Sequence, residues 1–357
     1  MLMRKFITLL ALSFFVSPAL AESWPTKEGE VVLKDFTFKD GEKLPEVRMH
    51  YTTLGTPHKG ADGKIDNAIM VLHGTGGSGK SFLVPQFADE LYGPGQPLDI
   101  AKNFIILPDN LGHGQSSKPS DRMRMAFPKY DYDDMVTAEY RMLTEGLGVT
   151  KLKLILGTSM GCMQAFVWGT TRPGFAQRLA PFACNATEIA GRNRAWRKMS
   201  IEAIKADPAW NGGNYTVQPA AGMRASTYLS MIAGANPVAL QSQYPTRDSA
   251  EAWLAKSFDA RGKGVDANDN IYQLDASRNY NPGPLLEKIT VPVLWINSAD
   301  DFINPPGLHL AETAAKRMPR ARFILIPESA ETKGHGTHTW AKFWKADLAK
   351  LLANSVK

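Results

Sequence analysis

Six short apolar runs recur along the chain with helix-sized intervals between them, and they constrain the fold more than any other feature. Largely continuous apolar runs are typical of strands that are buried on both faces of a sheet. Strands that are joined by helical crossovers run parallel to one another. The runs are Ala68–Leu72, Phe104–Leu107, Leu152–Leu156, Arg178–Ala183, Val291–Ile296 and Arg322–Ile326. We therefore predict an α/β fold with a mostly parallel sheet that helices cover on both faces.

The two ends of the chain add a hairpin and a final helix to this sheet. Two β-rich runs, Val31–Phe38 and Val47–Leu54, lie close together ahead of the first parallel strand and have the character of a hairpin. The closing segment Thr339–Ala353 carries apolar residues at helical spacing. This pattern predicts a terminal helix that packs on the sheet.

The strand signal disappears between Cys184 and Pro284, where the sequence becomes helical. We interpret residues 185–284 as a helical cap that is inserted between two late strands of one sheet. The core then comprises residues 22–184 and 285–357. The length of 357 residues fits one large α/β domain with an insertion.

The first 21 residues have the pattern of a secretory signal peptide. Arg4 and Lys5 precede an apolar run from Phe6 to Val16, and cleavage is expected after Ala21. The apolar run is well short of the roughly 20 residues that a membrane-spanning helix needs, so we expect no stable membrane anchor. The mature protein is therefore predicted to be periplasmic or secreted.

Charge and cysteine content exclude several classes of partner. The formal net charge is +6, and two of the positive charges lie in the predicted signal peptide. Such a mild and scattered excess does not favour a nucleic-acid partner. Two cysteines cannot build a cysteine-rich zinc site. The sequence leaves open whether Cys162 and Cys184 form a disulfide, since unpaired buried cysteines are common.

A glycine-rich segment after the first parallel strand matches a phosphate-binding loop. Gly74–Ser81 follows the pattern G-x-x-x-x-G-K-S, and Asp109 after the next strand could hold magnesium. However, the segment does not open a nucleotide domain, and an exported protein has no ATP supply. We therefore expect a tight glycine turn with a solvated Lys80, and no cofactor or metal.

A second glycine motif has the context of a nucleophile elbow. Gly157–Gly161 reads G-x-S-x-G, follows the run Leu152–Leu156 and precedes the helical run Met163–Gly169. A strand, a sharp turn and a helix are the setting that presents a nucleophilic serine. A serine that merely caps a helix fits the same sequence pattern. The presence of partner residues therefore decides whether the serine is a nucleophile. The motif makes Ser159 the candidate nucleophile.

A serine hydroxyl needs a histidine to take its proton and a carboxylate to orient that histidine. Both follow Ser159 in the expected order, each after a later strand. We assign the acid to Asp301, with Asp300 as the alternative if the loop is shifted by one residue. We assign the base to His335, which lies between two glycines, in preference to His338, which we expect to begin the final helix.

The same arrangement gives the first glycine segment a different role. The turn His73-Gly74-Thr75 ends an inner strand, where a backbone N–H can face the oxyanion of an acyl-transfer reaction. We predict that the N–H of Thr75 pairs there with the N–H of Met160, the residue after the nucleophile.

With these residues in place, the chain resembles the α/β-hydrolase superfamily over nearly all of its mature length. Within that superfamily it resembles the homoserine O-acetyltransferase family and its hydrolase-like relatives, through Ser159–Gln164 and Asp207–Tyr215. The superfamily motifs are His73-Gly74, Asp109–Ser116, Gly157–Gly161, Asp301–Pro305 and Gly334-His335. The resemblance implies an α/β-hydrolase sheet and an acyl-enzyme on Ser159.

Two departures bear on the acyl acceptor. The acetyltransferases usually carry a second glycine where this chain has Cys162, and a longer loop where it has Asn110–Ser117. An exported enzyme would also lack acetyl-CoA. We therefore expect a serine hydrolase that cleaves a small carboxylic ester or lactone. The alternative is an O-acyltransferase that uses a hydroxyl acceptor. The sequence leaves the oligomeric state open, a homodimer included.

Overall fold

The computed structural model describes residues 24–262 and 264–353. The predicted signal peptide, residues 1–21, lies outside the described residues. Within them, none of the helices combines the length and apolar character that a membrane crossing requires.

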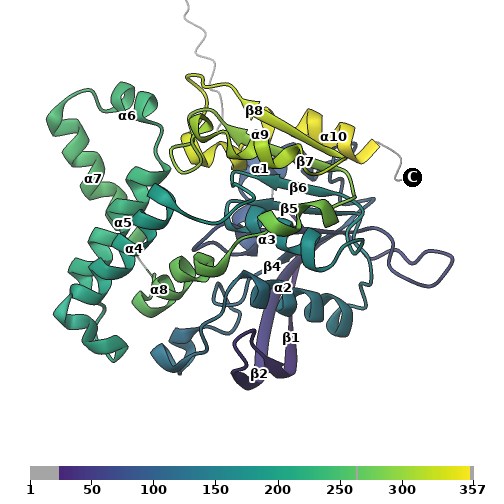
Figure 1. Ribbon diagram of the computed structural model, residues 1–357, viewed down its shortest axis with the longest axis horizontal. Helices are drawn as coiled ribbons and strands as arrows, with labels where there is room; N and C mark the ends of the chain where they lie inside the picture. Colours follow the sequence, from purple (N-terminus) through teal and green to yellow (C-terminus); the bar gives the residue numbers. More distant parts are fainter. Residues whose placement is uncertain (1–23, 263, 354–357) are drawn as a thin grey trace, which may run out of the picture.

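Within these described ranges, eight strands form one sheet in the order β1-β2-β4-β3-β5-β6-β7-β8. β1 and β2 form the predicted antiparallel hairpin, β2 pairs antiparallel with β4, and every later neighbour is parallel. The strands are β1 (Thr26–Thr37), β2 (Lys43–Leu54), β3 (Ala68–Leu72), β4 (Phe104–Pro108), β5 (Leu154–Thr158), β6 (Leu179–Phe182), β7 (Val293–Ser298) and β8 (Ala321–Ile326). The predicted mostly parallel α/β sheet is confirmed (Figure 1).

Helices cover both faces of the sheet because successive side chains on the inner strands point to opposite sides. On β3, Met70 and Leu72 pack in one apolar cluster with residues of α2, α3 and α9, whereas Ile69 and Val71 pack in another with residues of α1 and α10. The covering helices are α1 (Pro85–Leu91), α2 (Tyr132–Arg141), α3 (Met160–Thr171), α9 (Leu310–Ala315) and α10 (Lys345–Ala353).

In the part of the chain that the structure describes, five α-helices lie between β6 and β7, and we call them the inserted helices. Figure 1 shows α4 to α7 to the left of the sheet. They have a small apolar cluster of their own, which includes Ile201, Ile204, Met223, Ile271 and Leu274. The inserted helices are α4 (Gly191–Ala206), α5 (Ala220–Gly234), α6 (Pro237–Gln243), α7 (Arg247–Gly262) and α8 (Ala267–Asp275). The proposed division of the chain at residues 184 and 285 stays a prediction.

The final helix begins later than the sequence predicted. It starts at Lys345, after two short 3-10 turns, Gly334–Thr339 and Ala341–Phe343. Local side-chain hydrogen bonds favour the turn, because Thr337 Oγ1 accepts from Lys333 N–H and Thr339 Oγ1 donates to the Gly336 carbonyl. His338 therefore lies in this turn. Our prediction that His338 begins the final helix is wrong.

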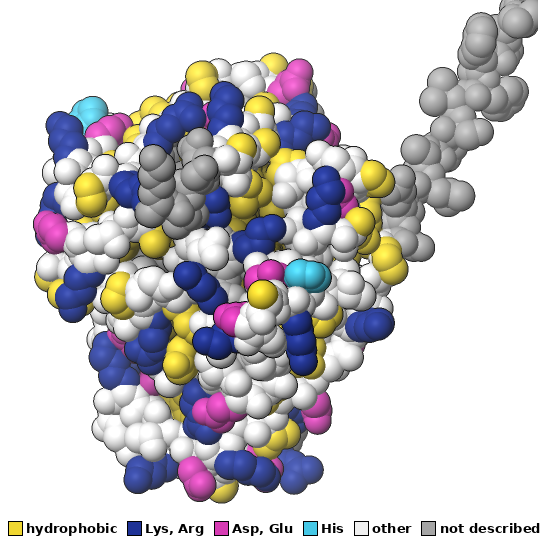
Figure 2. All heavy atoms as spheres, turned by 90° about the vertical axis from the view of Figure 1, so that its right-hand side faces the viewer, with side chains coloured by type: hydrophobic (Ala, Val, Ile, Leu, Met, Phe, Trp, Pro, Cys, Tyr) yellow, Lys and Arg dark blue, Asp and Glu magenta, His cyan; other side chains and the backbone are white. Residues whose placement is uncertain are grey.

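Charged side chains show no segregation by sign on the face drawn in Figure 2. Lys and Arg side chains are scattered over it, with Asp and Glu among them.

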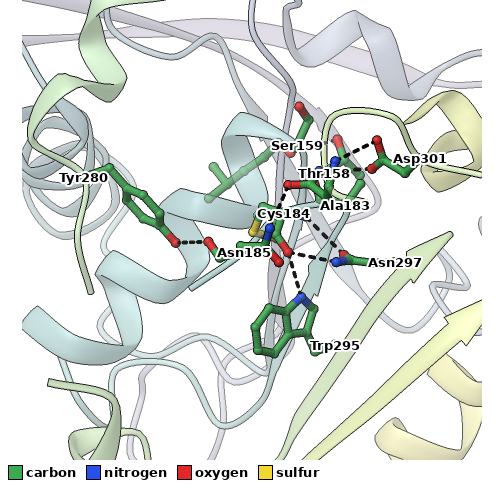
Figure 3. The surroundings of a disulfide bond; sticks show 12 residues. Thr158, Ser159, Ala183, Cys184, Asn185, Tyr280, Trp295, Asn297 and Asp301 are labelled. Carbon is green, nitrogen blue, oxygen red and sulfur yellow. Dashed lines mark hydrogen bonds between the residues drawn. A yellow bond between two sulfur atoms is a disulfide. The ribbon is translucent and has the colours of Figure 1, made fainter. Parts of the chain in front are cut away.

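The two cysteines, whose pairing the sequence left open, form a disulfide (Figure 3). Cys162 lies in the first turn of α3, which follows β5, and Cys184 lies just past the end of β6. Because β5 and β6 are neighbours in the sheet, the two Cα atoms are 5.9 Å apart. The bond joins the helix that follows Ser159 to the next loop along the sheet edge.

Replacing both cysteines by alanine should lower the free energy of unfolding by about 3 kcal/mol. The two cysteines are 22 positions apart, and without the bond the unfolded chain regains the conformational entropy that this closed loop had removed. Urea denaturation of oxidised protein measures this loss. Adding a thiol reductant should bring the wild type towards the double variant and leave the variant unchanged. Equal unfolding free energies in wild type and variant would contradict the structural role of the bond.

Candidate active site

Ser159 occupies a strained turn between β5 and α3. Its φ angle is +54°, in the left-handed region that residues with a side chain rarely adopt. The turn is crowded on both sides: a Cβ atom at position 157 would lie 2.0 Å from the Gly161 carbonyl oxygen, and one at position 161 would lie 2.1 Å from the Leu72 carbonyl oxygen. Only glycine fits at either position, as the nucleophile elbow requires.

His335 joins the other two predicted residues in a hydrogen-bond chain. Its Nε2 lies 2.8 Å from Ser159 Oγ, and its Nδ1 lies 2.8 Å from Asp301 Oδ2. An ionised carboxylate only accepts hydrogen bonds, so Nδ1 carries the proton and Nε2 is free to accept from the serine hydroxyl. The structure thus brings Ser159, His335 and Asp301 together in the order predicted for a nucleophile, a base and an acid.

The Asp301 carboxylate is buried and held by its own loop. Oδ1 accepts from the backbone N–H groups of Ile303 and Asn304, at 2.8 and 3.1 Å, and Oδ2 accepts from Asn304 Nδ2 at 3.0 Å. Burial alone would raise the pKa of Asp301, but the nearby His335 and the hydrogen bonds from His335 and Asn304 outweigh it, so this pKa is lowered. Asp301 therefore stays ionised beside the imidazole.

Sequence reasoning missed the part that Asn304 plays. Its Nδ2 also donates to the Ala183 carbonyl oxygen, at 3.1 Å, so one amide links the Asp301 loop to the loop after β6. The available signal was the Asp-x-x-Asn spacing, which allows the aspartate to accept backbone hydrogen bonds in a tight turn.

The two alternatives considered for the acid and the base occupy different environments. Asp300 accepts hydrogen bonds from Asn236 and Gly334, whereas Asp301 contacts the imidazole of His335. His338 contacts the backbone carbonyl of His335 through its Nδ1. Burial, with the nearby His335, lowers the pKa of His338 to about 4. Asp301 and His335 are therefore the pair that reaches Ser159.

The turn that contains Thr75 adjoins the nucleophile. A Cβ atom placed at Gly74 would lie 3.3 Å from Ser159 Cβ and 3.8 Å from Ser159 Oγ. His73 fixes this turn, because its Nδ1 lies 2.8 Å from the Gly74 carbonyl oxygen and its Nε2 accepts from Asn110 N–H at 3.1 Å. The N–H of Met160 belongs to the first residue of α3, where backbone donors lack a partner within the helix. The oxyanion role of Thr75 and Met160 stays a prediction.

In the segment that matches a phosphate loop, backbone N–H groups donate hydrogen bonds to other protein groups. Gly77 N–H donates to the Gly74 carbonyl at 3.0 Å, Ser78 N–H donates to Ser81 Oγ at 3.1 Å, and Gly79 N–H donates to Asp109 Oδ1 at 2.8 Å. Lys80 is exposed, as we expected of a solvated lysine, and it also forms an ion pair with Glu28 at 2.6 Å. Sequence could not show this pair because Glu28 lies on the distant strand β1.

A cavity of about 810 Å³ opens onto the hydrogen-bond chain. The core contributes Gly74, Thr75, Ser159 and His335 to its wall, and the inserted helices supply most of the remainder. Many of the latter side chains carry hydroxyl or amide groups: Ser226, Thr227, Ser230, Asn236, Asn270 and Gln273. In residues 24–262 and 264–353, no group of three or more His, Cys, Asp or Glu side chains could hold a metal ion.

His338 should make the protein less stable in mild acid. Its folded-state pKa of about 4 lies below the ordinary value near 6.5, so its contribution is complete above pH 6.5 and is lost as the pH falls towards 4. His338→Gln should therefore lose about 2 kcal/mol less unfolding free energy than the wild type between pH 7 and pH 5. Urea denaturation at both pH values measures the difference.

His309→Asn is the matched control, because His309 is exposed and asparagine tolerates its left-handed backbone. An identical change in unfolding free energy with pH in wild type and His338→Gln would contradict the lowered pKa of His338.

Comparisons with known proteins agree with this architecture. A family model described as the alpha/beta hydrolase fold matches residues 67–332. The chain is 28% identical over 296 residues to a probable acyltransferase of Methanothermobacter thermautotrophicus, covering 82% of this chain and 88% of that protein. It is 29% identical over 330 residues to a homoserine O-acetyltransferase of Chloroherpeton thalassium, covering 81% of this chain and 80% of that protein.

Solved structures extend the likeness of fold. Homoserine O-acetyltransferase from Bacillus anthracis superposes with a TM-score of 0.82 at 22% identity, over 93% of this chain and 99% of that chain. An acetylester hydrolase from Corynebacterium glutamicum superposes with a TM-score of 0.80 at 20% identity, over 92% of this chain and 96% of that chain. The sheet, the family match and these likenesses confirm the resemblance drawn from the sequence motifs. The chain belongs to the α/β hydrolase fold family.

Proposed function

We propose that the protein is an acyl-transfer enzyme in which Ser159 takes a short acyl group from an ester and passes it to the hydroxyl group of a second molecule. The observation that carries this proposal is the chain from Asp301 through His335 to Ser159, with both contacts at 2.8 Å. This geometry activates a serine hydroxyl for attack on a carbonyl carbon.

In the first half of the reaction, His335 Nε2 takes the proton of Ser159 Oγ as the oxygen bonds to the carbonyl carbon. Asp301 stabilises the resulting imidazolium by accepting a hydrogen bond from His335 Nδ1. The N–H groups of Thr75 and Met160 donate to the carbonyl oxygen as it becomes negatively charged. The bond to the leaving oxygen then breaks, and that oxygen receives the proton from His335.

In the second half, an acceptor hydroxyl gives its proton to His335 and its oxygen attacks the acyl carbon. The bond to Ser159 Oγ breaks, and Ser159 recovers its proton from the imidazolium. The sequence relatives support a hydroxyl acceptor and an acetyl group, because they include a probable acyltransferase and homoserine O-acetyltransferases.

Water is the second candidate acceptor, which makes the enzyme an esterase or lactonase, as the sequence alone led us to expect. Two observations favour it. The first 21 residues resemble a secretory signal peptide, and Cys162 and Cys184 form a disulfide, a bond that persists mainly in oxidising compartments. We propose that the protein is exported to a compartment that lacks the thioester donors of the cytoplasm.

Ser159→Ala should lower the turnover of p-nitrophenyl acetate by at least about 10³-fold, because no nucleophile remains to form the acyl-enzyme. The release of p-nitrophenol measures the rate, and the melting temperature should stay near that of the wild type. Ser249→Ala, in the first turn of α7, is the matched control and should keep full activity. A Ser159→Ala variant with wild-type turnover would contradict the acyl-enzyme.

The two acceptors can be separated by product analysis with p-nitrophenyl acetate as the donor and homoserine as the added acceptor. A transferase should give more O-acetyl product than free acetate, and p-nitrophenol release should accelerate if deacylation limits the rate. Chromatography of both products gives the ratio. Free acetate alone, at a rate that homoserine does not change, would assign the protein as a hydrolase.

A further inference from the structure

We propose that Asp300 is a positioning residue that ties the His335 loop to the inserted helices, so that the base and one wall of the cavity are held by a single buried carboxylate. The inference rests on the proposed role of His335 in acyl transfer. It gives the residue next to Asp301 a different task from the acid itself.

Three separate parts of the chain meet at the Asp300 carboxylate. Oδ2 accepts a hydrogen bond from Asn236 Nδ2 at 2.6 Å and another from Gly334 N–H at 2.8 Å, and Oδ1 accepts from Ser298 Oγ. Asn236 belongs to the turn between α5 and α6, and Gly334 immediately precedes His335. The Asp300 side chain is thus a bridge between the inserted helices and the loop of the base.

Asn236 is fixed at both ends of its amide group. Its oxygen accepts from Ala239 N–H at 2.9 Å and so caps α6, while its nitrogen donates to Asp300. Asn236 is itself buried and lines the cavity together with Ser159 and His335. Any rotation of this amide would break the cap and the bridge at once.

The backbones on the two sides of the bridge are in direct contact. Gly334 has a φ angle of +59°, and a Cβ atom there would lie 2.9 Å from Asn236 N and 3.1 Å from the Gly234 carbonyl oxygen. Because no side chain lies between them, a shift of the turn between α5 and α6 moves the backbone beside His335. The 2.8 Å contact between His335 Nε2 and Ser159 Oγ therefore depends on where the inserted helices lie.

A carboxylate is the group that this position requires. Its two oxygens accept three hydrogen bonds from neutral donors, and among the described residues Asp300 takes part in none of the ion pairs with Lys, Arg or His. Asparagine has nearly the same size, but its single neutral oxygen accepts the hydrogen bonds from Asn236 and Gly334 more weakly than a carboxylate does, and its NH₂ group replaces the acceptor that faces Ser298 Oγ. Asp300→Asn should therefore loosen the bridge without creating a cavity.

The first test compares Asp300→Asn with Asp134→Asn. Asp134 is also a buried carboxylate that accepts backbone hydrogen bonds, from Lys39 and Asp131, but it lies in α2. Asp300→Asn should lower kcat/KM for p-nitrophenyl acetate about 10- to 100-fold, because His335 is misaligned and the wall at Asn236 shifts. We expect kcat to fall and KM to rise, while Asp134→Asn changes neither, whatever its loss of stability.

Amide hydrogen exchange gives a second readout that does not depend on activity. In Asp300→Asn, exchange should become faster at residues 332–338 and at residues 234–240 together, whereas Asp134→Asn should leave both segments unchanged. If wild-type protein turns over no ester, the proposed function fails. The exchange pattern still tests whether Asp300 bridges the His335 loop and the inserted helices. An Asp300→Asn variant that matches wild type or Asp134→Asn in both readouts would overturn the inference.

Asn236→Ser breaks the bridge from its other side and serves if Asp300→Asn does not fold. Serine still caps α6 but is too short to reach Asp300. If the two residues act through one bond, the double variant should be about as active as the less active of the two single variants. The two losses of activity then do not add. Fully additive losses in the double variant would also contradict the bridge.

Discussion

Four neighbouring parallel strands end at the same edge of the sheet, and the candidate site depends on that constraint. Ser159 follows β5, Cys184 follows β6, Asp301 follows β7 and His335 follows β8, with the four strands adjacent in that order. Because each loop contacts the next, short bonds across the loops can set the site. The disulfide joins the helix after Ser159 to the loop after β6, Asn304 joins that loop to the loop after β7, and Asp301 and Asp300 join the loop after β7 to the loop after β8.

Two adjacent aspartates illustrate how environment divides the work of like residues. Asp301 and Asp300 are both buried and both accept three or more hydrogen bonds. One of the partners of Asp301 is the imidazole that reaches Ser159, so its charge is placed where an imidazolium forms during the reaction. Among the described residues, Asp300 instead accepts only from neutral backbone, amide and hydroxyl groups, which suits a fixed structural bridge. The direction of the side chain, and not the residue type, separates the two roles.

The parts of the structure that sequence could predict are those with short-range signals. Buried parallel strands read as apolar runs, and a strained elbow needs glycine at positions 157 and 161, so the sheet and the position of Ser159 could be read directly. The pair of Lys80 with Glu28, the link from Asn304 to Ala183 and the bridge from Asp300 to Asn236 could not. They join residues that lie far apart in the chain, and only the folded sheet edge brings them together. The late start of α10 was missed because the spacing of apolar residues does not reveal local hydrogen bonds of threonine side chains.

The central claim is that Ser159 carries the acyl group, and the most direct measurement is mass spectrometry of protein quenched in acid during turnover of p-nitrophenyl acetate. The account predicts one acetyl group on the wild-type protein, located by peptide mapping to Ser159, which the Ser159→Ala variant lacks. Acetylation at another residue, or turnover without any acetylated protein while deacylation is slowed by low temperature, would contradict it.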